Sequence, residues 1–176
     1  MRVGKLALAV GVTACVLGAG PAALAASVPK GGNVRIFVTN TSSPTKSKIL
    51  VTGAIGDYGT TVSQNANGKP NPNGNFEKVT LKQGGFIVNA TALNQKLNSA
   101  KPTVNTTNCS VAFTATGPTT IQDGTGAYAG ITGKVAITIT FAGIAPKTAK
   151  GCDLANNAPT YGEYSSITGT GSVSFK

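Results

Sequence analysis

The feature that most constrains the fold is a strict alternation of apolar and polar residues in several segments of the chain. In the clearest case, residues 134–141, four apolar side chains alternate with Lys, Ala and Thr; they are Val135, Ile137, Ile139 and Phe141. The same pattern occurs in residues 34–39, 110–115 and 167–175. A period of two with β-branched residues is typical of strands that bury one face. The many threonines suit the other face, because their branched Cβ fits the pleat while the hydroxyl stays in water.

Turn-forming residues separate these segments. Residues 65–74 are rich in Asn, Gly and Pro and predict a long polar loop, and four glycines between positions 124 and 133 predict a second turn. Only residues 91–100 suggest a helix, because Leu93 and Leu97 lie four positions apart and Pro102 follows. The sequence therefore predicts six to eight strands and at most a short helix.

An all-β chain of this kind must protect the edges of its sheet from pairing with other chains. A closed antiparallel barrel and a two-sheet sandwich both do so. We expect an all-β fold, a small antiparallel barrel of about eight strands, with a β-sandwich as the alternative.

The first 25 residues have the three parts of a signal peptide. Arg2 and Lys5 supply a positive start, residues 6–18 an apolar middle, and residues 23–25 an Ala-Leu-Ala cleavage signal. The apolar run is too short and too interrupted by glycine to span a bilayer. We expect residues 1–25 to be removed and residues 26–176 to form one secreted domain without a transmembrane span.

An alternative fate for the N-terminus is a lipid anchor. Residues 12–15, Val-Thr-Ala-Cys, resemble a lipobox, the bacterial motif in which the cysteine is acylated. The apolar run continues through residues 16–20, whereas lipoproteins usually turn polar after that cysteine. Secretion is the expected outcome, and anchoring through Cys15 is the alternative.

Two cysteines, Cys109 and Cys152, remain after removal of the signal peptide. In an oxidising compartment such a pair most simply forms a disulfide. The alternative is two buried free thiols. We expect a Cys109–Cys152 bond that holds a loop against the rim of the barrel.

The formal charge of +10 is explained first by solubility, and attraction to an anionic partner, such as a polymer of a cell envelope, is the functional alternative. Nucleic acid is not the expected partner. Arg35 is the one arginine after the signal peptide, and the lysines are scattered rather than clustered beside aromatic residues.

The chain contains no histidine, which excludes Ser-His-Asp and Cys-His nucleophile systems and His-ligated zinc sites. Five carboxylates remain: Asp57, Glu77, Asp123, Asp153 and Glu163. Asp123 has no other carboxylate near it in sequence, as a calcium-binding loop would need. We expect both Asp123 and Asp153 to form turns rather than to bind a ligand. No catalytic residue, metal site or cofactor is predicted.

Asp57 has the most unusual position of the five. Counting by twos from Ile49 puts it on the apolar face of a strand, unless a bulge at Gly53 or Gly56 turns it outward. A buried carboxylate is costly without hydrogen-bond partners. Tyrosines could supply them, and we take Asp57, Tyr58 and Tyr128 as candidate ligand-binding residues.

Two glycine-bearing segments resemble a known group of barrels. Residues 52–59, TGAIGDYG, are similar to an early strand of the dirigent and allene oxide cyclase superfamily, and residues 123–133, DGTGAYAGITG, resemble its later glycine-rich turn. The resemblance implies an eight-stranded barrel with an apolar cavity. Its members steer the coupling of phenoxy radicals or cyclise an oxidised fatty acid inside the barrel, but no catalytic residue can be carried over beyond these segments.

Two functions follow as expectations, and the sequence leaves open whether the protein is an enzyme. The first is a secreted, non-catalytic barrel that binds a small apolar ligand or an envelope component. The second is a cyclase, isomerase or dirigent-like protein that shapes a reactive intermediate in its cavity. An open cavity that contains Asp57 and a tyrosine would favour the second.

Overall fold

The computed structural model describes residues 30–40, 46–155 and 160–176. The predicted signal peptide, its cleavage site and Cys15 lie outside these ranges. Within them, no helix combines the length and the apolar character needed to cross a bilayer.

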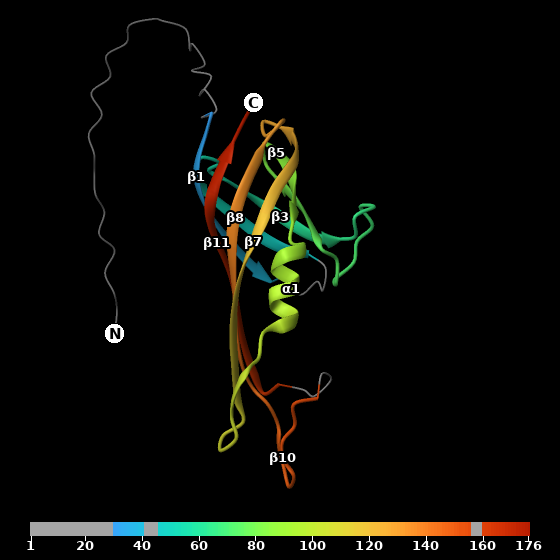
Figure 1. Ribbon diagram of the computed structural model, residues 1–176, viewed down its shortest axis with the longest axis vertical. Helices are drawn as coiled ribbons and strands as arrows, with labels where there is room; N and C mark the ends of the chain where they lie inside the picture. Colours follow the sequence, from blue (N-terminus) through green and yellow to red (C-terminus); the bar gives the residue numbers. More distant parts are fainter. Residues whose placement is uncertain (1–29, 41–45, 156–159) are drawn as a thin grey trace, which may run out of the picture.

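Eight antiparallel strands close into a barrel, which confirms the predicted fold class and decides against the sandwich (Figure 1). The strands around the barrel follow the order β5-β4-β3-β2-β1-β11-β8-β7, and pairing of β5 with β7 completes the ring. Their bounds are β1 Gly31–Asn40, β2 Lys46–Gly53, β3 Asp57–Gln64, β4 Phe76–Leu81, β5 Gly84–Asn89, β7 Ser110–Gly126, β8 Thr132–Ile144 and β11 Gly162–Ser174.

The alternation in the sequence becomes the two faces of the barrel wall. In β8, Val135 and Ile137 are buried in the core, while Lys134 and Ala136 are exposed on the outside. Each neighbouring strand contributes inward side chains in the same way, and together they form one apolar core. Removing this apolar surface from water is the main favourable term in folding.

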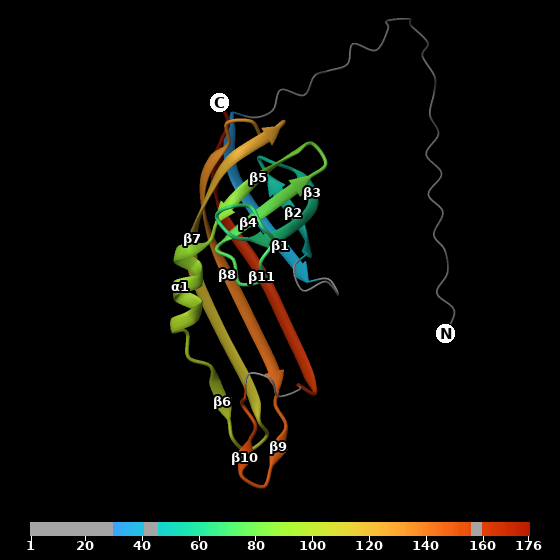
Figure 2. The ribbon, with the colours of Figure 1, turned by 90° about the vertical axis from the view of Figure 1, so that its right-hand side faces the viewer.

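Three strands run well beyond the barrel. β7, β8 and β11 contain 17, 13 and 13 residues, and their far halves form a narrow sheet below it (Figure 2). β6 (Thr103–Asn105) pairs with β7 there, and β9 (Lys147–Thr148) and β10 (Gly151–Cys152) form a small hairpin. We call the part formed by residues 101–114, 140–155 and 160–166 the stem.

The predicted disulfide is present in the stem. Cys109 and Cys152 are joined with an S–S distance of 2.08 Å and a Cα–Cα distance of 5.3 Å. The bond connects the start of β7 to the β9–β10 hairpin, so its predicted position at the barrel rim was wrong. The reason is that β7 and β8 continue past the barrel before the chain reaches either cysteine.

In the described ranges the chain forms one helix, α1 (Thr91–Ser99), which confirms the predicted helical segment and lies against β7 at the junction of barrel and stem (Figures 1 and 2). It covers the stretch of β7 between Ala112, where the pairing with β6 ends, and Thr120, where the pairing with β5 begins. Gly117 permits the close approach, because a Cβ there would lie 2.7 Å from the Cα of Leu93.

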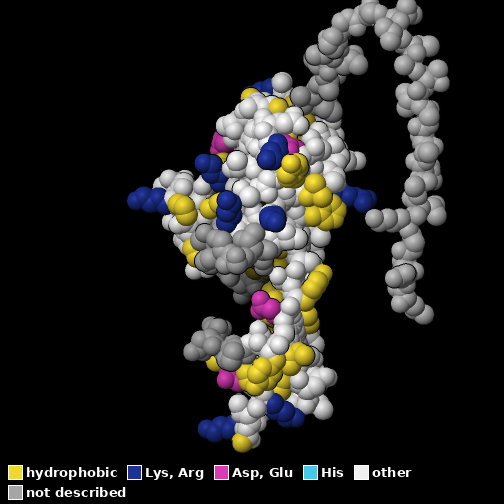
Figure 3. Space-filling view, turned by 180° about the vertical axis from the view of Figure 1, so that it is seen from behind, with side chains coloured by type: hydrophobic (Ala, Val, Ile, Leu, Met, Phe, Trp, Pro, Cys, Tyr) yellow, Lys and Arg dark blue, Asp and Glu magenta, His cyan; other side chains and the backbone are white. Residues whose placement is uncertain are grey.

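The outer surface of the barrel is basic. Five cationic side chains are exposed on β1, β2, β4 and the turn after β4; they are Arg35, Lys46, Lys48, Lys78 and Lys82. The two carboxylates on strands β1–β4, Asp57 and Glu77, lie on the inward face instead. Figure 3 shows the resulting mixture of dark blue and yellow side chains over the barrel, seen from behind.

Candidate functional site

The barrel has two different ends. We call the end beside the β7–β8 turn, residues 127–131, the closed end, and the end that faces α1 and the stem the stem end (Figure 1). At the closed end Tyr128 is 2% exposed and contacts two other rings. Its ring centroid lies 6.1 Å from that of Phe86, edge to face, and 6.2 Å from that of Phe175. Aromatic side chains therefore fill this end.

Asp57 lies in the closed end with its acceptors in use. Its carboxylate, in a residue only 4% exposed, accepts a hydrogen bond of 2.7 Å from the hydroxyl of Tyr128. The backbone N–H groups of Tyr58, Gln83 and Lys82 donate to it as well, at 2.7, 3.0 and 3.4 Å. The side chain thus ties the start of β3 to the β4–β5 turn and to the β7–β8 turn.

The same contacts decide the protonation states of this pair. Burial alone would raise the pKa of Asp57, but the hydrogen bonds from Tyr128 and from the backbone of Gln83, Tyr58 and Lys82 outweigh burial and hold that pKa below its ordinary value. Burial, followed by the hydrogen bond to Asp57 and its negative charge, raises the pKa of Tyr128 well above its ordinary value. An ionised Asp57 and a neutral Tyr128 are therefore the stable combination around neutral pH.

The structure places the three candidate ligand-binding residues in two environments. Asp57 is inward, as the count by twos predicted, although β2 ends at Gly53 and a turn with left-handed glycines precedes β3. Tyr128 is its partner. Tyr58 is 58% exposed on the outer face, with the Lys82 ammonium 5.5 Å from its ring centroid. A ligand-binding role for these residues stays a prediction, and their contacts favour a structural one for Asp57 and Tyr128.

A cavity of about 240 Å³ opens instead at the stem end. Its walls come from all eight strands of the barrel and from α1, and most of its lining side chains are Ile, Val, Leu or Ala. The lining residues are Ile36, Val38, Ser47, Ile49, Thr61, Ser63, Glu77, Val79, Val88, Ala90, Leu93, Asn94, Thr119, Ile137, Ile139 and Ile167. None of the three predicted site residues is among them.

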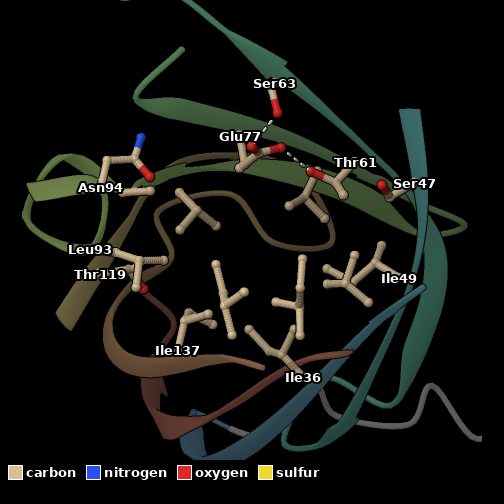
Figure 4. A pocket seen from close by; sticks show the side chains of 16 residues that line it. Ile36, Ser47, Ile49, Thr61, Ser63, Glu77, Leu93, Asn94, Thr119 and Ile137 are labelled. Carbon is tan, nitrogen blue, oxygen red and sulfur yellow. Dashed lines mark hydrogen bonds between the residues drawn. The ribbon is translucent and has the colours of Figure 1, made fainter. Parts of the chain in front are cut away.

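Glu77 gives this cavity its one charged side chain. Its Oε2 accepts a hydrogen bond of 2.8 Å from the hydroxyl of Thr61, and its Oε1 accepts one from the hydroxyl of Ser63. The β3–β4 register explains the cluster, because Ser63 pairs directly with Glu77 and Thr61 pairs with Val79 one inward position further on. Figure 4 shows these polar groups along one wall and Ile36 and Ile137 on the opposite wall.

Two other polar side chains of the cavity, Thr119 and Asn94, donate to protein acceptors. The Thr119 hydroxyl donates to the backbone carbonyl of Val135 at 2.9 Å. The Asn94 amide donates to the Asn75 side chain at 2.8 Å and to the Gly74 carbonyl at 3.3 Å. No lysine or arginine is among the lining residues. The cavity is therefore amphipathic, with one anionic group on an apolar background.

Sequence reasoning missed Glu77, although a signal was present. The segment of β4 reads Phe-Glu-Lys-Val-Thr-Leu, in which Glu77 shares its parity with the buried Val79 and Leu81. An acid on the apolar parity of a strand was the argument applied to Asp57. Applied to Glu77, the same argument would have found the cavity residue.

A paired-carboxylate mechanism does not fit this arrangement. Asp57 and Ser63, which pairs with Glu77, are six positions apart on β3, or about 20 Å of strand. Glycosidases need their two carboxyl groups within about 10 Å of each other. In the described part of the chain, no three Cys, Asp or Glu residues are grouped so that they could hold a metal ion. The cavity therefore presents one carboxylate on an apolar background.

The two segments that resemble dirigent-type barrels have structural roles at the closed end. Gly53 and Gly56, with φ of 82° and 60°, form the β2–β3 turn before Asp57. Residues 123–131 carry Tyr128 inward, and a Cβ on Gly124 would lie 1.7 Å from the Tyr128 carbonyl oxygen. Neither a family model, nor a curated protein, nor a solved structure matches this chain.

Proposed function

We propose that this protein binds a small, mostly apolar molecule in the cavity at the stem end of the barrel. The observation that carries this proposal is the 240 Å³ of space inside walls of Ile and Val. A dry apolar cavity of about 150 Å³ is enough to bind benzene, whereas sites for drug-sized ligands begin near about 300 Å³. A single ring or a short alkyl chain is therefore the matching size.

The contents of the cavity favour binding over catalysis. A cyclase-like, isomerase-like or dirigent-like reaction, the alternative suggested by the sequence, would be supported by Asp57 and a tyrosine in the cavity. Instead, the Tyr128 hydroxyl donates its hydrogen bond to Asp57 at the closed end, and Tyr58 points outward. Glu77 alone offers little for the chemistry of a reactive intermediate, so catalysis is the weaker proposal.

Titration with 1-hexanol, monitored by calorimetry, tests the proposal. We expect saturable binding at one site, which Ala90→Leu weakens at least tenfold because the added atoms occupy the cavity. Ala136→Leu is the matched control, since Ala136 is exposed on the outside of β8. Equal affinity in Ala90→Leu and the wild type, or no binding of hexanol to either, contradicts the proposal.

The outer face of β1–β3 supports a second candidate function, attachment to an anionic polysaccharide. Phe37, Leu50 and Tyr58 are 41%, 46% and 58% exposed and lie side by side in the register of the three strands. Strands are about 4.8 Å apart, so the row is about 10 Å long. Arg35 and Lys48 lie two positions from Phe37 and Leu50 on the same faces of β1 and β2, and the Lys82 ammonium lies 5.5 Å from the Tyr58 ring centroid. This face carries no described carboxylate. Rings of this kind can stack on sugars while the cations attract acidic groups.

Sedimentation with an insoluble acidic polysaccharide tests this second function. We expect Leu50→Ser with Tyr58→Ser to abolish binding, and rising salt to weaken it, because surface charges are screened within about 8 Å at physiological ionic strength. Ile144→Ser with Tyr164→Ser removes comparably exposed side chains from the stem and serves as the control. Equal binding by both double variants contradicts the proposal.

Both functions belong outside the cell, and we propose that the mature chain is secreted. The Cys109–Cys152 bond is compatible with an oxidising compartment. N-terminal sequencing of protein from a culture supernatant should find Ala26 or Ser27 first. An intact Met1, or a lipid-modified Cys15 in the membrane fraction, would contradict secretion.

A further inference from the structure

The carboxylate of Glu77 faces an apolar cavity with its acceptor capacity only partly used. An ionised carboxylate has about four acceptor sites, and the hydroxyls of Thr61 and Ser63 occupy two of them. Placing a charge against apolar surface is costly unless it is hydrogen-bonded and paired with an opposite charge. The residues that line the cavity include hydroxyls but no cation. A cationic ligand that enters the cavity can supply the pairing charge.

We infer that the ligand is a small apolar amine that binds as its ammonium ion, with Glu77 as the counter-ion; this inference rests on the proposed cavity function. An ammonium group has three donors. One meets the Glu77 carboxylate, and the oxygens of Thr61 and Ser63, which donate to Glu77, are free to accept the others. The alkyl or aryl part then lies against the isoleucines of the opposite wall (Figure 4).

The alternative head groups fit the site less well. A carboxylate ligand would place a like charge beside Glu77, which disfavours both ions in an apolar setting. An alcohol can donate one hydrogen bond to Glu77, but it brings no opposite charge to pair with the carboxylate, and it has one donor where an ammonium group has three. The basic outer surface does not reverse this order, because its cations are exposed to solvent and salt screens them.

A matched set of probes separates the inference from the proposed function. Hexylammonium, 1-hexanol and hexanoate share one alkyl chain, so differences in affinity report the head group. We expect hexylammonium to bind about tenfold to a hundredfold more tightly than 1-hexanol, the range for one hydrogen bond to a charged group, and hexanoate to bind least. Calorimetry at neutral pH and physiological salt gives the three dissociation constants.

Glu77→Gln keeps the shape and an acceptor oxygen but removes the charge. In this variant hexylammonium should lose its advantage over 1-hexanol, so that the two dissociation constants become similar. Glu163→Gln is the control, because it removes the same charge from an exposed position on β11 in the stem. A thermal unfolding curve for each variant confirms that it is folded.

Each outcome separates the two ideas. If 1-hexanol binds but hexylammonium binds no better, the inference is wrong and the apolar cavity function stands. If no probe binds, both are wrong. If hexylammonium keeps its advantage in Glu77→Gln, the counter-ion is not Glu77 and the inference is wrong. A merely structural Glu77 would change the stability of the variant without changing its preference among head groups.

Discussion

At the closed end of the barrel, Asp57 accepts hydrogen bonds from four donors, and the rings of Phe86, Tyr128 and Phe175 fill the space around it. At the stem end, Glu77 accepts from two hydroxyls and borders a cavity of about 240 Å³. Both carboxylates are inward-facing members of neighbouring strands. What separates them is the number of acceptor sites left open and the empty volume beside them.

This difference shows why burial alone is a poor guide to function. The more deeply buried carboxylate, Asp57, is the one whose contacts explain it completely as a structural group. The half-buried Glu77 is the one that a ligand could still reach and satisfy. In a barrel with few charged residues inside, the incompletely satisfied group is the better candidate for recognition.

The largest expected effect of a single substitution is the loss of the Asp57 carboxylate. Asp57→Ala leaves the Tyr128 hydroxyl and three backbone N–H groups without their acceptor, and we expect the free energy of unfolding to fall by about 3–5 kcal/mol. Denaturant unfolding measures this, with the exposed Glu163→Ala as a control for loss of charge. A loss below that of the control would show that the closed end is not held by Asp57.

This expectation replaces the one that the sequence suggested. With Asp57 in a cavity, Asp57→Ala would have changed ligand binding and left folding intact. Because Asp57 does not line the cavity, we expect any folded Asp57→Ala protein to bind 1-hexanol with the affinity of the wild type.

The stem contributes to neither end of the barrel, so removing its disulfide tests whether ligand binding depends on the barrel alone. Replacing Cys109 and Cys152 by Ala should lower the free energy of unfolding by about 2–4 kcal/mol, the upper value being the loop-closure entropy for a separation of 43 residues. None of the residues that line the cavity lies in the stem. The affinity for 1-hexanol should therefore stay unchanged, and a weakened affinity would mean that stem and cavity are coupled.

At the closed end, Asp57 and Tyr128 should make the free energy of unfolding depend on pH, Asp57 at acid pH and Tyr128 at alkaline pH. Asp57 has its pKa lowered on folding, so its contribution is present above the unfolded value of about 4 and is lost as the pH falls through the folded value. Tyr128 has its pKa raised, so the unfolded chain alone ionises above about pH 10 and stability is lost as the pH rises further.

Two variants test whether Asp57 and Tyr128 cause the losses of stability at acid and at alkaline pH. Asp57→Asn should flatten the loss of stability on the acid side, and Tyr128→Phe the loss on the alkaline side. Each should also cost about 1–3 kcal/mol at neutral pH, because one buried hydrogen bond to a charged group is weakened or removed. Unfolding free energies between pH 2 and 11 measure both effects. Curves parallel to that of the wild type would mean that other groups cause the pH dependence.

Local patterns in the sequence were sufficient for the strands but not for their assembly. The alternation in residues 134–141 predicted β8, and the residues of β1 and β11 followed from the same rule. Closure into a barrel depends on the pairing of β5 with β7, which are far apart in sequence and contain glycines that resemble turn signals. The stem was missed for a similar reason: the alternation was followed only through residues 110–115, whereas β7 continues through Gly117 and Pro118 to Gly126.

The site could be predicted only in part, because a cavity is a property of packing. Parity predicted that Asp57 is inward, and the same rule would have identified Glu77. Which of the two borders empty space depends on where Tyr128 and Phe175 fill the barrel and where α1 stops. Those positions are decided by contacts between residues distant in sequence. The pairing of Cys109 with Cys152 needed no such information, since two cysteines allow one intramolecular bond.

The smallest expected effect is the one that would most sharpen the comparison between the two ends. Glu77→Ala removes an inward carboxylate, as Asp57→Ala does, yet we expect the free energy of unfolding to fall by less than about 1 kcal/mol. Ser63 is half-buried and Thr61 is buried, but both border the open cavity, so water can replace the acceptor that their hydroxyls lose. Removing the charge from an apolar wall offsets part of the loss. Denaturant unfolding of the two variants side by side gives the difference directly. A loss for Glu77→Ala as large as that for Asp57→Ala would mean that Glu77 holds β3 to β4 as a structural group, and the reason for treating the stem end as the binding end would be gone.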